Sequence, residues 1–493
     1  MRYVSVPIEL PLSEIRESEA CFSPSRYVRF IPPKVLSENN FVPLDKLILL
    51  RDSRIVAEKG KLYRYAEIGD IDVDTGGIVF RSIPGYQLPT KRPSIAKQGD
   101  VLVSTVRTYR KGIGYVSDNG DNLVTTNAVL NICGVTDFAA NLTLLYVYSF
   151  LRTDFFVEQV WSLLNRGLYP RMDKGALDKI LIPISCDKKV IQYVSALMQA
   201  IVEKEKVIRE RHDAITSAIE EELSINNRGK AFQYAFPRIS EIKESSRFDS
   251  GLYCPGFRSF KHLVDDYKRG STCLSKMGVK TRRGPNLAVS VIGKSLYSEE
   301  VKPGWYQLIR PVNISAYGTL AQMEWLGSPK KLPLVQQGDL IMGCEGFEKG
   351  RTIVIVDPID RCTTNFHGTV IYWPRSELWQ VVFLRCFLAF LRERGVIDWV
   401  GVGGSGGHMS PDYFDYLPIP KFPEEKQREI ARLYHKDAPP SPGKPTLDNF
   451  VGWHQQRNDY LGIWELDREM KDLQRTLFEV QEQIIEGKTV KIP

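Results

Sequence analysis

The sequence lacks the patterns that would tie a chain to a membrane, to secretion or to a disulfide framework. The longest apolar run, Leu142 to Phe150, is too short to span a bilayer. The N-terminus has no basic region followed by an apolar core, so we expect no secretory signal. The eight cysteines are scattered and form no Cys-x-x-Cys pair, which favours reduced thiols in a cytoplasmic protein over a zinc site.

The sequence also lacks the motifs of nucleotide-using and DNA-modifying enzymes. Gly401 to Gly406 reads GVGGSG, but the His-Met-Ser-Pro that follows does not open the helix that a dinucleotide site needs, and no Walker lysine is present. No Asn-Pro-Pro motif typical of methyltransferases occurs, and the Glu-x-Lys letters of a nuclease fall at Glu203 to Lys206, inside a predicted helix. The six histidines have no metal-ligand spacing. We therefore expect a chain that carries no catalytic site, metal or cofactor.

Charge of one sign is not in large excess. A net charge of +7 over 493 residues is too mild to indicate a nucleic-acid partner by itself. The hydrophobic content of 43% and the charged content of 25% are ordinary for a globular protein. The length is sufficient for two or three domains with their own cores.

A long helix is predicted near the middle of the chain. The stretch from Lys188 to Leu223 has no Gly or Pro and would be on the order of 50 Å long. Glu205 and His212 fill two positions of an apolar seam that steps by three and four residues, and we expect them to set the register against a partner helix. This seam favours a coiled coil over a long core helix inside one domain; its apolar members are Ile191, Val194, Met198, Ile201, Ile208, Ile215 and Ile219.

The C-terminal region supplies a candidate partner helix. The proline-rich stretch at 436–445 interrupts a first helical segment, and the helix is predicted to resume around Leu447. A second seam then follows at Leu466, Met470, Leu473, Leu477, Val480 and Ile484. The two seams predict a pair of helices, one central and one terminal.

The sequence on either side of the central helix is repeated. Gln98-Gly99-Asp100 returns as Gln337-Gly338-Asp339, and Thr125-Thr126-Asn127 returns as Thr363-Thr364-Asn365. Both halves end in an Ile-Pro exit, at Ile182-Pro183 and at Ile419-Pro420, that leads into a charged helix start. The repeat predicts two related domains, at 1–187 and 229–423, with helical segments at 188–228 and 424–493.

Basic and aromatic residues gather in predicted loops of both domains. Arg and Lys bind phosphates and read base edges, so these loops are candidate DNA contacts, although ordinary solvated loops remain the alternative. The loops after the two Gln-Gly-Asp turns differ in chemistry, which favours related modules that recognise different ligands. The candidate residues are Lys91, Arg92, Arg107, Tyr109, Arg110, Lys111, Arg166, Tyr169, Arg171, Lys280, Arg282, Arg283, Lys349, Arg351, Ser405 and His408.

This arrangement resembles the DNA-specificity subunit of type I restriction–modification systems. The resemblance covers nearly the whole chain and rests on the Gln-Gly-Asp turns, the Ile-Pro exits, the Gly-rich loop Ser405 to Ser410 and the helix start Pro423 to Gln427. Domain 1 departs from it, because it lacks a clear Gly-rich loop and has Cys186 to Lys189 at its helix start.

The resemblance implies an α+β chain in which two related α/β target-recognition domains are separated by long helices that form an antiparallel coiled coil. It implies that each domain reads one half of a split double-stranded DNA target, and that two methyltransferase subunits dock on the helices. Restriction or translocase subunits are further implied partners. S-adenosylmethionine, ATP and Mg²⁺ are then expected on those partners and not on this chain. Two alternatives stay open: a coiled-coil adaptor that binds no DNA, and the specificity subunit of a modification-only system.

Overall fold

The computed structural model describes residues 2–17, 27–33, 40–139, 141–163, 171–172, 174–403, 407–437 and 443–493. The chain divides into two compact units, each with mixed helix and sheet content. Unit 1 comprises Met1–Val207, Pro440–Tyr460 and Arg468–Pro493, and unit 2 comprises Ile208–Pro439 and Leu461–Asp467. The central and C-terminal segments therefore contribute residues to both units.

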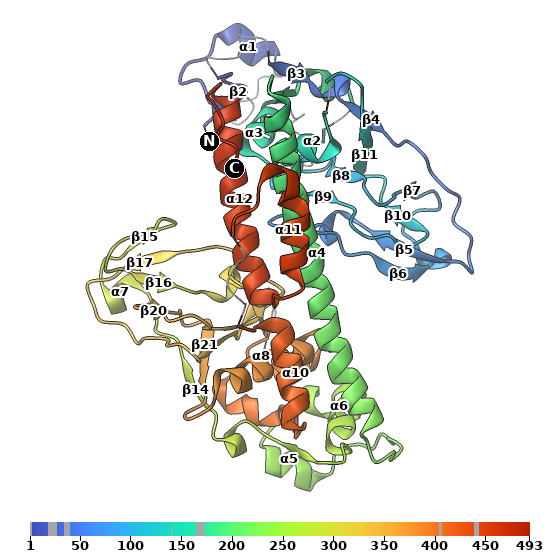
Figure 1. The fold of residues 1–493 in the computed structure, drawn as a ribbon. Coiled ribbons are helices and arrows are strands. Elements are labelled where there is room, and N and C mark those ends of the chain that lie inside the picture. Colours follow the sequence, from blue (N-terminus) through green and yellow to red (C-terminus); the bar gives the residue numbers. More distant parts are fainter. Residues whose placement is uncertain are drawn as a thin grey trace. The chain divides into compact units, whose positions relative to one another are not determined.

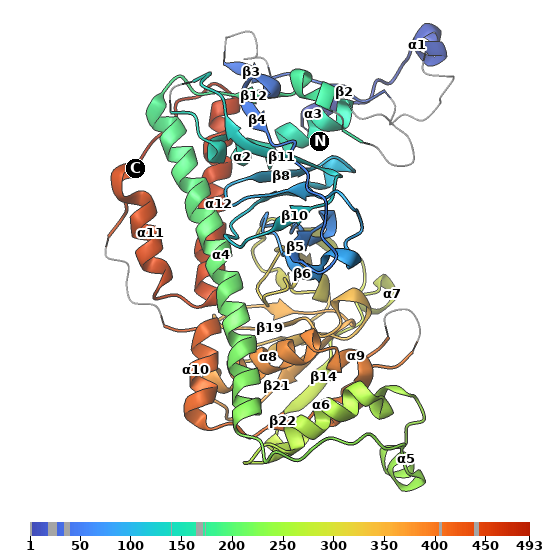
Figure 2. The same ribbon diagram turned by 90° about the vertical axis from the view of Figure 1, so that its right-hand side faces the viewer.

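Unit 1 contains two four-stranded sheets, which lie on the same side of the N-terminal half of the central helix α4 (Figure 2). The first is antiparallel, in the order β4 (Ile48–Leu50), β11 (Val129–Val135), β8 (Val101–Ser104), β9 (Ile113–Tyr115). The second pairs β5 and β10 in parallel, in the order β6 (Arg81–Pro84), β5 (Leu62–Ala66), β10 (Leu123–Thr125), β7 (Ser94–Ile95). The smaller elements of unit 1 are β1 (Val4–Ser5), β2 (Arg29–Phe30), β3 (Phe41–Pro43), β12 (Leu181–Pro183), α1 (Leu12–Glu17), α2 (Leu144–Leu151) and α3 (Asp154–Leu163).

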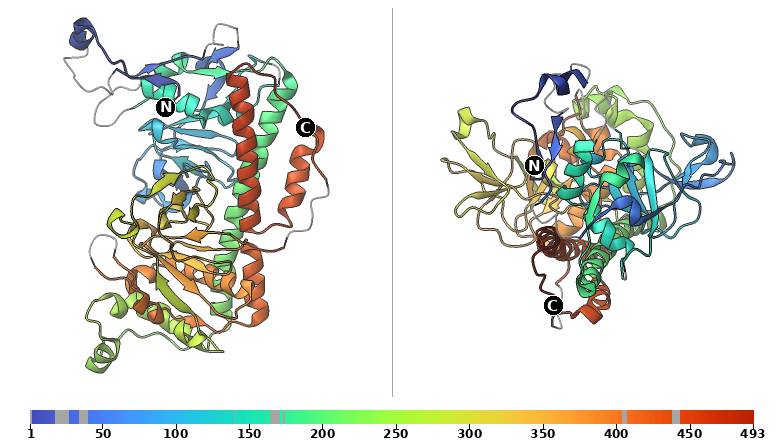
Figure 3. Two further views of the ribbon diagram at one scale, coloured as in Figure 1. Left: turned by 90° about the vertical axis from the view of Figure 1, so that its left-hand side faces the viewer. Right: turned by 90° about the horizontal axis from the view of Figure 1, so that it is seen from above.

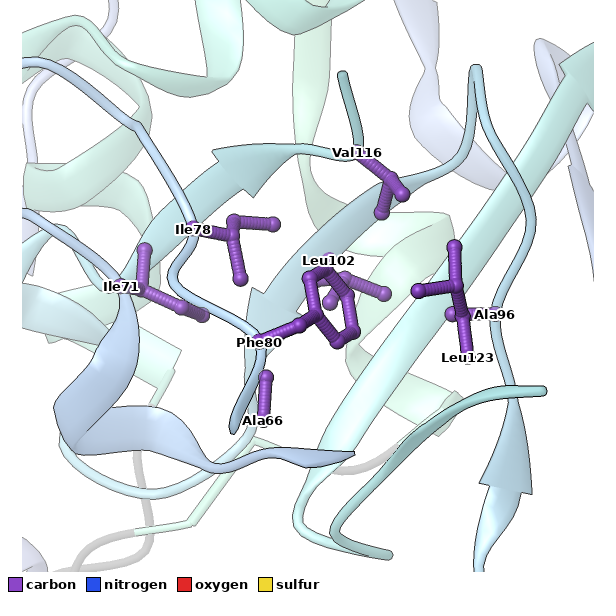
Figure 4. Packing of buried hydrophobic residues seen from close by; sticks show 8 residues of the cluster. All are labelled: Ala66, Ile71, Ile78, Phe80, Ala96, Leu102, Val116 and Leu123. Atoms are coloured by element: carbon purple, nitrogen blue, oxygen red, sulfur yellow. The ribbon is translucent and has the colours of Figure 1, made fainter. Parts of the chain in front are cut away.

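The core of unit 1 joins its two sheets. Buried side chains from β5, β8 and β10 point toward one another, together with residues of the connecting loops (Figure 4). All four residues of β8 are buried, which explains its continuous apolar sequence, because a strand covered on both faces needs no alternation. The cluster comprises Ala66, Ile71, Ile78, Phe80, Ala96, Leu102, Val116 and Leu123.

Unit 2 repeats the strand order of unit 1 in its first sheet and in three adjacent strands of its second sheet, whose fourth strand lies at the opposite end. Its first sheet is antiparallel, in the order β14 (Lys280–Arg283), β21 (Gly368–Tyr372), β18 (Leu340–Gly343), β19 (Thr352–Val354). Its second sheet also contains one parallel pair, β16 with β20, in the order β15 (Leu296–Ser298), β17 (Trp325–Gly327), β16 (Tyr306–Leu308), β20 (Cys362–Thr363). The pair β13 (Ser271–Thr272) and β22 (Ile419–Pro420) corresponds to β3 and β12, because both Ile-Pro exits lie in these short strands. The repeat read from the sequence is therefore a repeat of strand order.

A further sequence repeat lies at the start of each unit. Leu12-Ser13-Glu14-Ile15 in α1 returns as Ile239-Ser240-Glu241-Ile242 in α5 (Ile239–Ser245). The first residue of each copy is exposed, 72% for Leu12 and 73% for Ile239. In both copies the Glu binds an Arg farther along, with Glu14 to Arg29 at 2.7 Å and Glu241 to Arg258 at 2.8 Å. The duplication thus extends beyond the sheets.

The predicted central helix is present as α4 (Lys188–Ile225), 38 residues long. The C-terminal helix differs from the prediction, because it does not run unbroken from Leu447. A 3-10 turn at Leu447–Asn449 and α11 (Phe450–Asn458) come first, and α12 (Ile463–Ile485) follows after a second break. A Cβ added at Gly462 would lie 2.7 Å from the backbone carbonyl of Tyr434, so only glycine permits this close approach.

In unit 1, α12 lies beside the N-terminal half of α4 and runs in the opposite direction (Figures 1 and 3). Helix α11 also packs on α4, where the rings of Tyr193 and Phe450 meet at 5.8 Å. The predicted seam is buried on both helices, at Ile191, Val194, Met198 and Ile201 on α4 and at Leu473, Leu477 and Val480 on α12. A coiled coil along the full length of both helices stays a prediction.

In unit 2, the C-terminal half of α4 lies beside α10 (Glu424–Tyr434) (Figures 1 and 2). His212 does not set a register against the terminal helix, which corrects the sequence expectation: its ring hydrogen-bonds Glu393, the last residue of α8. The remaining helices are α6 (Pro255–Asp265), α7 (Val289–Ile292), α8 (Leu378–Glu393) and α9 (Val396–Val400). No helix in the described part of the chain has the length and apolar character needed to cross a membrane.

Candidate nucleic-acid interface

The loops that follow β8 and β18 share one backbone frame. In unit 1 the Ser104 N–H donates to the Gly112 carbonyl at 2.8 Å, and in unit 2 the Gly343 N–H donates to the Arg351 carbonyl at 2.8 Å. The next residue of each loop also has an equivalent bond: the Thr105 N–H donates to the Ala128 carbonyl just before β11, and the Cys344 N–H donates to the His367 carbonyl just before β21, both at 2.9 Å. The loop 105–112 is therefore equivalent, position by position, to the loop 344–351.

A second segment completes the frame in both units. The Met172 N–H donates to the Thr105 carbonyl at 2.8 Å, and the Met409 N–H donates to the Cys344 carbonyl at 2.9 Å. Arg171 is paired with Val106 just as His408 is paired with Glu345. Arg171 is thus the structural counterpart of His408. The sequence held a signal for this match, because Met172 and Met409 precede Leu-Asp and Phe-Asp at the same spacing.

The two loops share left-handed φ values at two equivalent positions with different residues, although the 3-10 turn is Thr108–Arg110 in unit 1 and Gly346–Glu348, one position earlier, in unit 2. Arg107 and Lys111 adopt left-handed φ values of 51° and 58° in unit 1, and their equivalents in unit 2 are Gly346 and Gly350, at 66° and 81°. A left-handed L-residue costs roughly 1–2 kcal/mol, whereas glycine adopts the conformation freely. Unit 1 keeps its two cations at these turns in spite of that strain.

The loop of unit 1 is held by its neighbours. The Tyr109 ring meets Trp161 edge to face at 4.5 Å, and the Lys111 ammonium lies 2.6 Å from the Asp154 carboxylate. The Thr108 hydroxyl donates to the Ser104 carbonyl at 2.6 Å and closes the turn. The predicted site residues Lys91, Arg92, Arg110 and Arg171 are exposed, whereas Arg107, Tyr109 and Lys111 are half-buried. Arg166 and Tyr169 lie outside the described residues.

In unit 2 the equivalent loop carries a carboxylate in a polar cluster. Glu345 accepts from the ring of His367 at 2.7 Å and from the Arg283 guanidinium at 3.4 Å, and its carboxylate lies 2.9 Å from Nδ1 of His408. Arg283 also binds His408 and lies over the ring of Phe366, with 4.9 Å to its centroid. The structure therefore brings together two predicted site residues, Arg283 and His408, around a carboxylate that the sequence reasoning missed.

Glu345 stays ionised in this cluster. Burial raises the pKa of its carboxyl, but hydrogen bonds from His367 and Arg283 and the nearby His408 outweigh burial, so the pKa lies below its ordinary value. An ionised carboxylate only accepts hydrogen bonds. The site in unit 2 thus presents an acceptor where the equivalent loop of unit 1 presents cations.

Three other predicted residues of unit 2 support the loops from inside. Lys349 is paired with Asp398 at 2.9 Å and its side chain is 6% exposed. The guanidinium of Arg282 donates to the Leu334 carbonyl, and that of Arg351 donates to the Ile314 carbonyl at 2.9 Å. These contacts give Lys349, Arg282 and Arg351 a structural role in the free protein. Lys280 is exposed at the start of β14, and Ser405 lies outside the described residues.

The residues of these loops that the sequence did not indicate are an acid, a histidine and two phenylalanines, because the prediction rested mainly on Arg, Lys and Tyr. Besides Glu345 and His367, the loops carry Phe347, which is 94% exposed, and Phe366, which is also exposed. Aligning the two Gln-Gly-Asp turns would have placed Glu345 opposite Val106 and marked the position as different. Within the described ranges, no group of three or more His, Cys, Asp or Glu side chains is arranged to hold a metal ion.

Comparison with known proteins gives no sequence match and a likeness to three solved structures. No protein-family model and no curated protein matches the chain. One similar chain comes from a type I R-M system studied for its assembly and conformational transition (16% identity, 91% of this chain and 98% of that chain, TM-score 0.31). A second is the HsdS subunit from Thermoanaerobacter tengcongensis (17% identity, 91% and 97%, TM-score 0.31).

The third similar chain is the S subunit of a type I restriction-modification system from M. genitalium (14% identity, 94% of this chain and 100% of that chain, TM-score 0.36). The solved chains that this protein is similar to are thus subunits of type I restriction-modification systems. Because the identities and TM-scores are low, we base the functional proposal on the chain's own residues.

Proposed function

We propose that this chain is a non-catalytic, sequence-specific DNA-binding subunit of a restriction–modification complex. The observation that carries the proposal is the common backbone frame of the loops after β8 and β18, which is filled with different polar side chains in the two units. A frame that is kept while its exposed side chains change is the expected arrangement for two modules that read different sequences.

Each unit is proposed to read one half of a bipartite target. The helix α4 contributes residues to both units, so its length is a candidate determinant of the gap between the half-sites. Two methyltransferase subunits are proposed to dock on the helices, with restriction or translocase subunits as further partners. S-adenosylmethionine, ATP and Mg²⁺ belong to those partners in this proposal.

Selection from random-sequence DNA tests the proposal directly. The chain, together with its methyltransferase partner, should enrich a site made of two specific blocks separated by a spacer of fixed length. Replacing residues 1–187 with the corresponding part of a different specificity subunit should change one block and leave the other unchanged. If selection enriches no bipartite site even with the partner present, the proposal is wrong.

Salt dependence separates the proposal from a coiled-coil adaptor that binds no DNA. Neutralising phosphates releases counterions, so log Kd should rise steeply and linearly with log salt concentration. An adaptor would show no measurable affinity and no slope. The slope also gives the number of phosphate contacts, because each contact contributes about 0.9 to it. The slope of the unaltered chain is therefore the reference for its variants.

A further inference from the structure

The loop after β18 places an acid at the mouth of a cleft in unit 2. The cleft has a volume of about 720 Å³ and is lined by Glu345, Glu348, His367, Arg310 and the backbone of Gly403 and Gly407, among others. A carboxylate that faced phosphates would weaken DNA binding by repulsion. An acid at a DNA-reading loop therefore needs a partner on the DNA that donates hydrogen bonds.

Hydrogen-bond accounting leaves Glu345 able to accept another donor. An ionised carboxylate offers about four acceptor sites. Arg283 donates to Oε1 at 3.4 Å and His367 donates to Oε2 at 2.7 Å, while Nδ1 of His408 lies 2.9 Å from Oε1. The side chain is 31% exposed and lines the cleft, so a ligand can reach it.

Arg283 and His408 fix the direction of this carboxylate. The Arg283 guanidinium donates to the Phe366 carbonyl at 3.0 Å, binds His408 and lies over the Phe366 ring. It therefore makes its contacts inside unit 2 and holds His408 against Glu345. These two residues act through Glu345, which makes them positioning residues.

We propose that Glu345 accepts a hydrogen bond from the exocyclic amino group of one base and so sets one position of the half-site read by unit 2. In the major groove the amino groups are cytosine N4 and adenine N6, whereas guanine and thymine present acceptors at O6, N7 and O4. A carboxylate pairs with the first two and is repelled by the others. The inference rests on the proposed function and adds the chemical class of the base.

The equivalent positions of unit 1 lack this acceptor. Val106 stands where Glu345 stands, and Arg171 stands where His408 stands. The restriction to an amino-bearing base should therefore occur in one half-site only. Unit 1 provides the internal control in every experiment on Glu345.

The test is DNA selection with Glu345→Gln, which keeps the shape of the side chain but can donate as well as accept. The unaltered chain should favour cytosine or adenine at one position of one block, by roughly 5- to 150-fold over the excluded bases. If the base is cytosine, Glu345→Gln should lose this preference at that position alone. If the base is adenine, Gln can still pair with N6 and N7, and Glu345→Leu, which can neither accept nor donate, is the variant that should lose it. Which of the two bases the unaltered chain selects distinguishes the cytosine amino group from that of adenine.

Two further variants sharpen the result. Glu348→Gln removes the other carboxylate of the same cleft and should change no position. Arg283→Met should relax the same position as Glu345→Gln and leave the salt slope unchanged, because Arg283 is not proposed to contact a phosphate. Glu345→Asp keeps the carboxylate on a shorter side chain and should retain a weaker preference at the same position, so its comparison with the variants that lack the carboxylate ties the effect to the acceptor.

The outcomes separate this inference from the proposed function. If the unaltered chain enriches no bipartite site, the proposed function fails. If it enriches a site and Glu345→Leu leaves every position unchanged, the inference is wrong and the proposed function stands. If a Glu345 variant weakens base preferences in both blocks, the inference is also wrong, because such an effect indicates a general loss of folding.

Discussion

The loops after β8 and β18 are framed by equivalent hydrogen bonds in the two units but carry different side chains. At the two left-handed turn positions of the shared loop, unit 1 has Arg107 and Lys111, and unit 2 has Gly346 and Gly350. Unit 2 thus reaches the conformation without strain, and unit 1 reaches it with two side chains that disfavour it. Backbone strain kept at an exposed polar loop points to a functional reason for the side chains. The two units thus share the backbone frame of the loop, and the side chains that it carries differ between them.

The two halves of α4 are anchored differently as well. In unit 1, Lys204 is fully buried and its ammonium lies 2.8 Å from both Asn458 and Glu469. In unit 2, His212 and Thr216 bind Glu393, which is partly exposed, and Glu220 pairs with the exposed Arg394. The unit 1 half is held by a buried charge and the unit 2 half by contacts near the surface.

The largest effect is expected from breaking the ion pair between the buried Lys204 and Glu469. Burial lowers the pKa of Lys204, and Glu469 acts against that shift. Glu469→Gln leaves the fully buried Lys204 ammonium without the charge of Glu469, which is itself 21% exposed, and should destabilise unit 1 by roughly 3 kcal/mol. The matched change in unit 2, Glu393→Gln, should cost under about 1 kcal/mol, because the pair is nearer to solvent.

Amide hydrogen exchange at increasing urea concentrations measures the stability of both units in one experiment. Exchange at the amides of 188–207 reports on unit 1, and exchange at 208–225 reports on unit 2. Glu469→Gln should accelerate the first set strongly, and Glu393→Gln should accelerate the second set slightly. Equal effects of the two variants would remove the distinction between the anchors.

The next effect is a pH dependence specific to unit 1. His454 is buried beside Lys204 and Arg457, and its pKa is lowered from 6.5 to about 4, first by burial and then by these cations. Protonation therefore favours the unfolded chain: stability is full above about pH 6.5 and falls as the pH drops toward about 4. The shift corresponds to a loss of about 3 kcal/mol at the acid limit.

Replacing the ring should flatten this acid slope. In His454→Gln, the melting temperature is expected to vary less between about pH 6.5 and pH 4 than in the unaltered chain. Calorimetry at several pH values provides the measurement. An identical slope in both proteins would show that His454 does not control the acid response of unit 1.

The sequence predicted those parts of the fold that local patterns specify. The helix α4 follows from its composition and its three-four seam, and the strand after each Gln-Gly-Asp turn follows from continuous apolar runs such as Val101–Ser104. The break before α12 was not predicted, because it depends on the close approach of Gly462 to Tyr434, far apart in sequence. Tertiary contacts of this kind have no local pattern.

The site was predicted less completely than the fold. Arg283 and His408 were selected for their charge, but the residue that joins them, Glu345, is acidic and was passed over. Lys204 was missed because the seam offered Glu205 beside it, although both residues are buried. Conversely, Lys349 was selected as a surface cation, although its side chain is covered and paired with Asp398. Which cation faces outward is decided by packing.

A smaller effect tests the strained cation of unit 1. Arg107→Gly gives unit 1 the residue of unit 2, so it should stabilise the fold by about 1 kcal/mol through relief of the left-handed strain. If Arg107 contacts a phosphate, DNA affinity should fall about tenfold and the salt slope should fall by about 0.9. Melting temperature and salt-dependent binding measure the two opposite changes. A variant that is less stable and binds DNA as before would show that Arg107 serves the fold.

The smallest effect is the converse change in unit 2. Gly346→Ala keeps the φ of 66° but adds a Cβ whose nearest neighbour, the Glu348 carboxylate, lies 3.5 Å away, an ordinary contact. Only the left-handed strain remains, so stability should fall by about 1 kcal/mol while base preference and salt slope stay unchanged. Gly350→Ala should cost more, because its Cβ would lie 3.0 Å from the Arg392 side chain. Arg107→Gly and Gly346→Ala thus move stability in opposite senses while only Arg107→Gly changes binding, as expected if the frame is shared and the recognition chemistry is not.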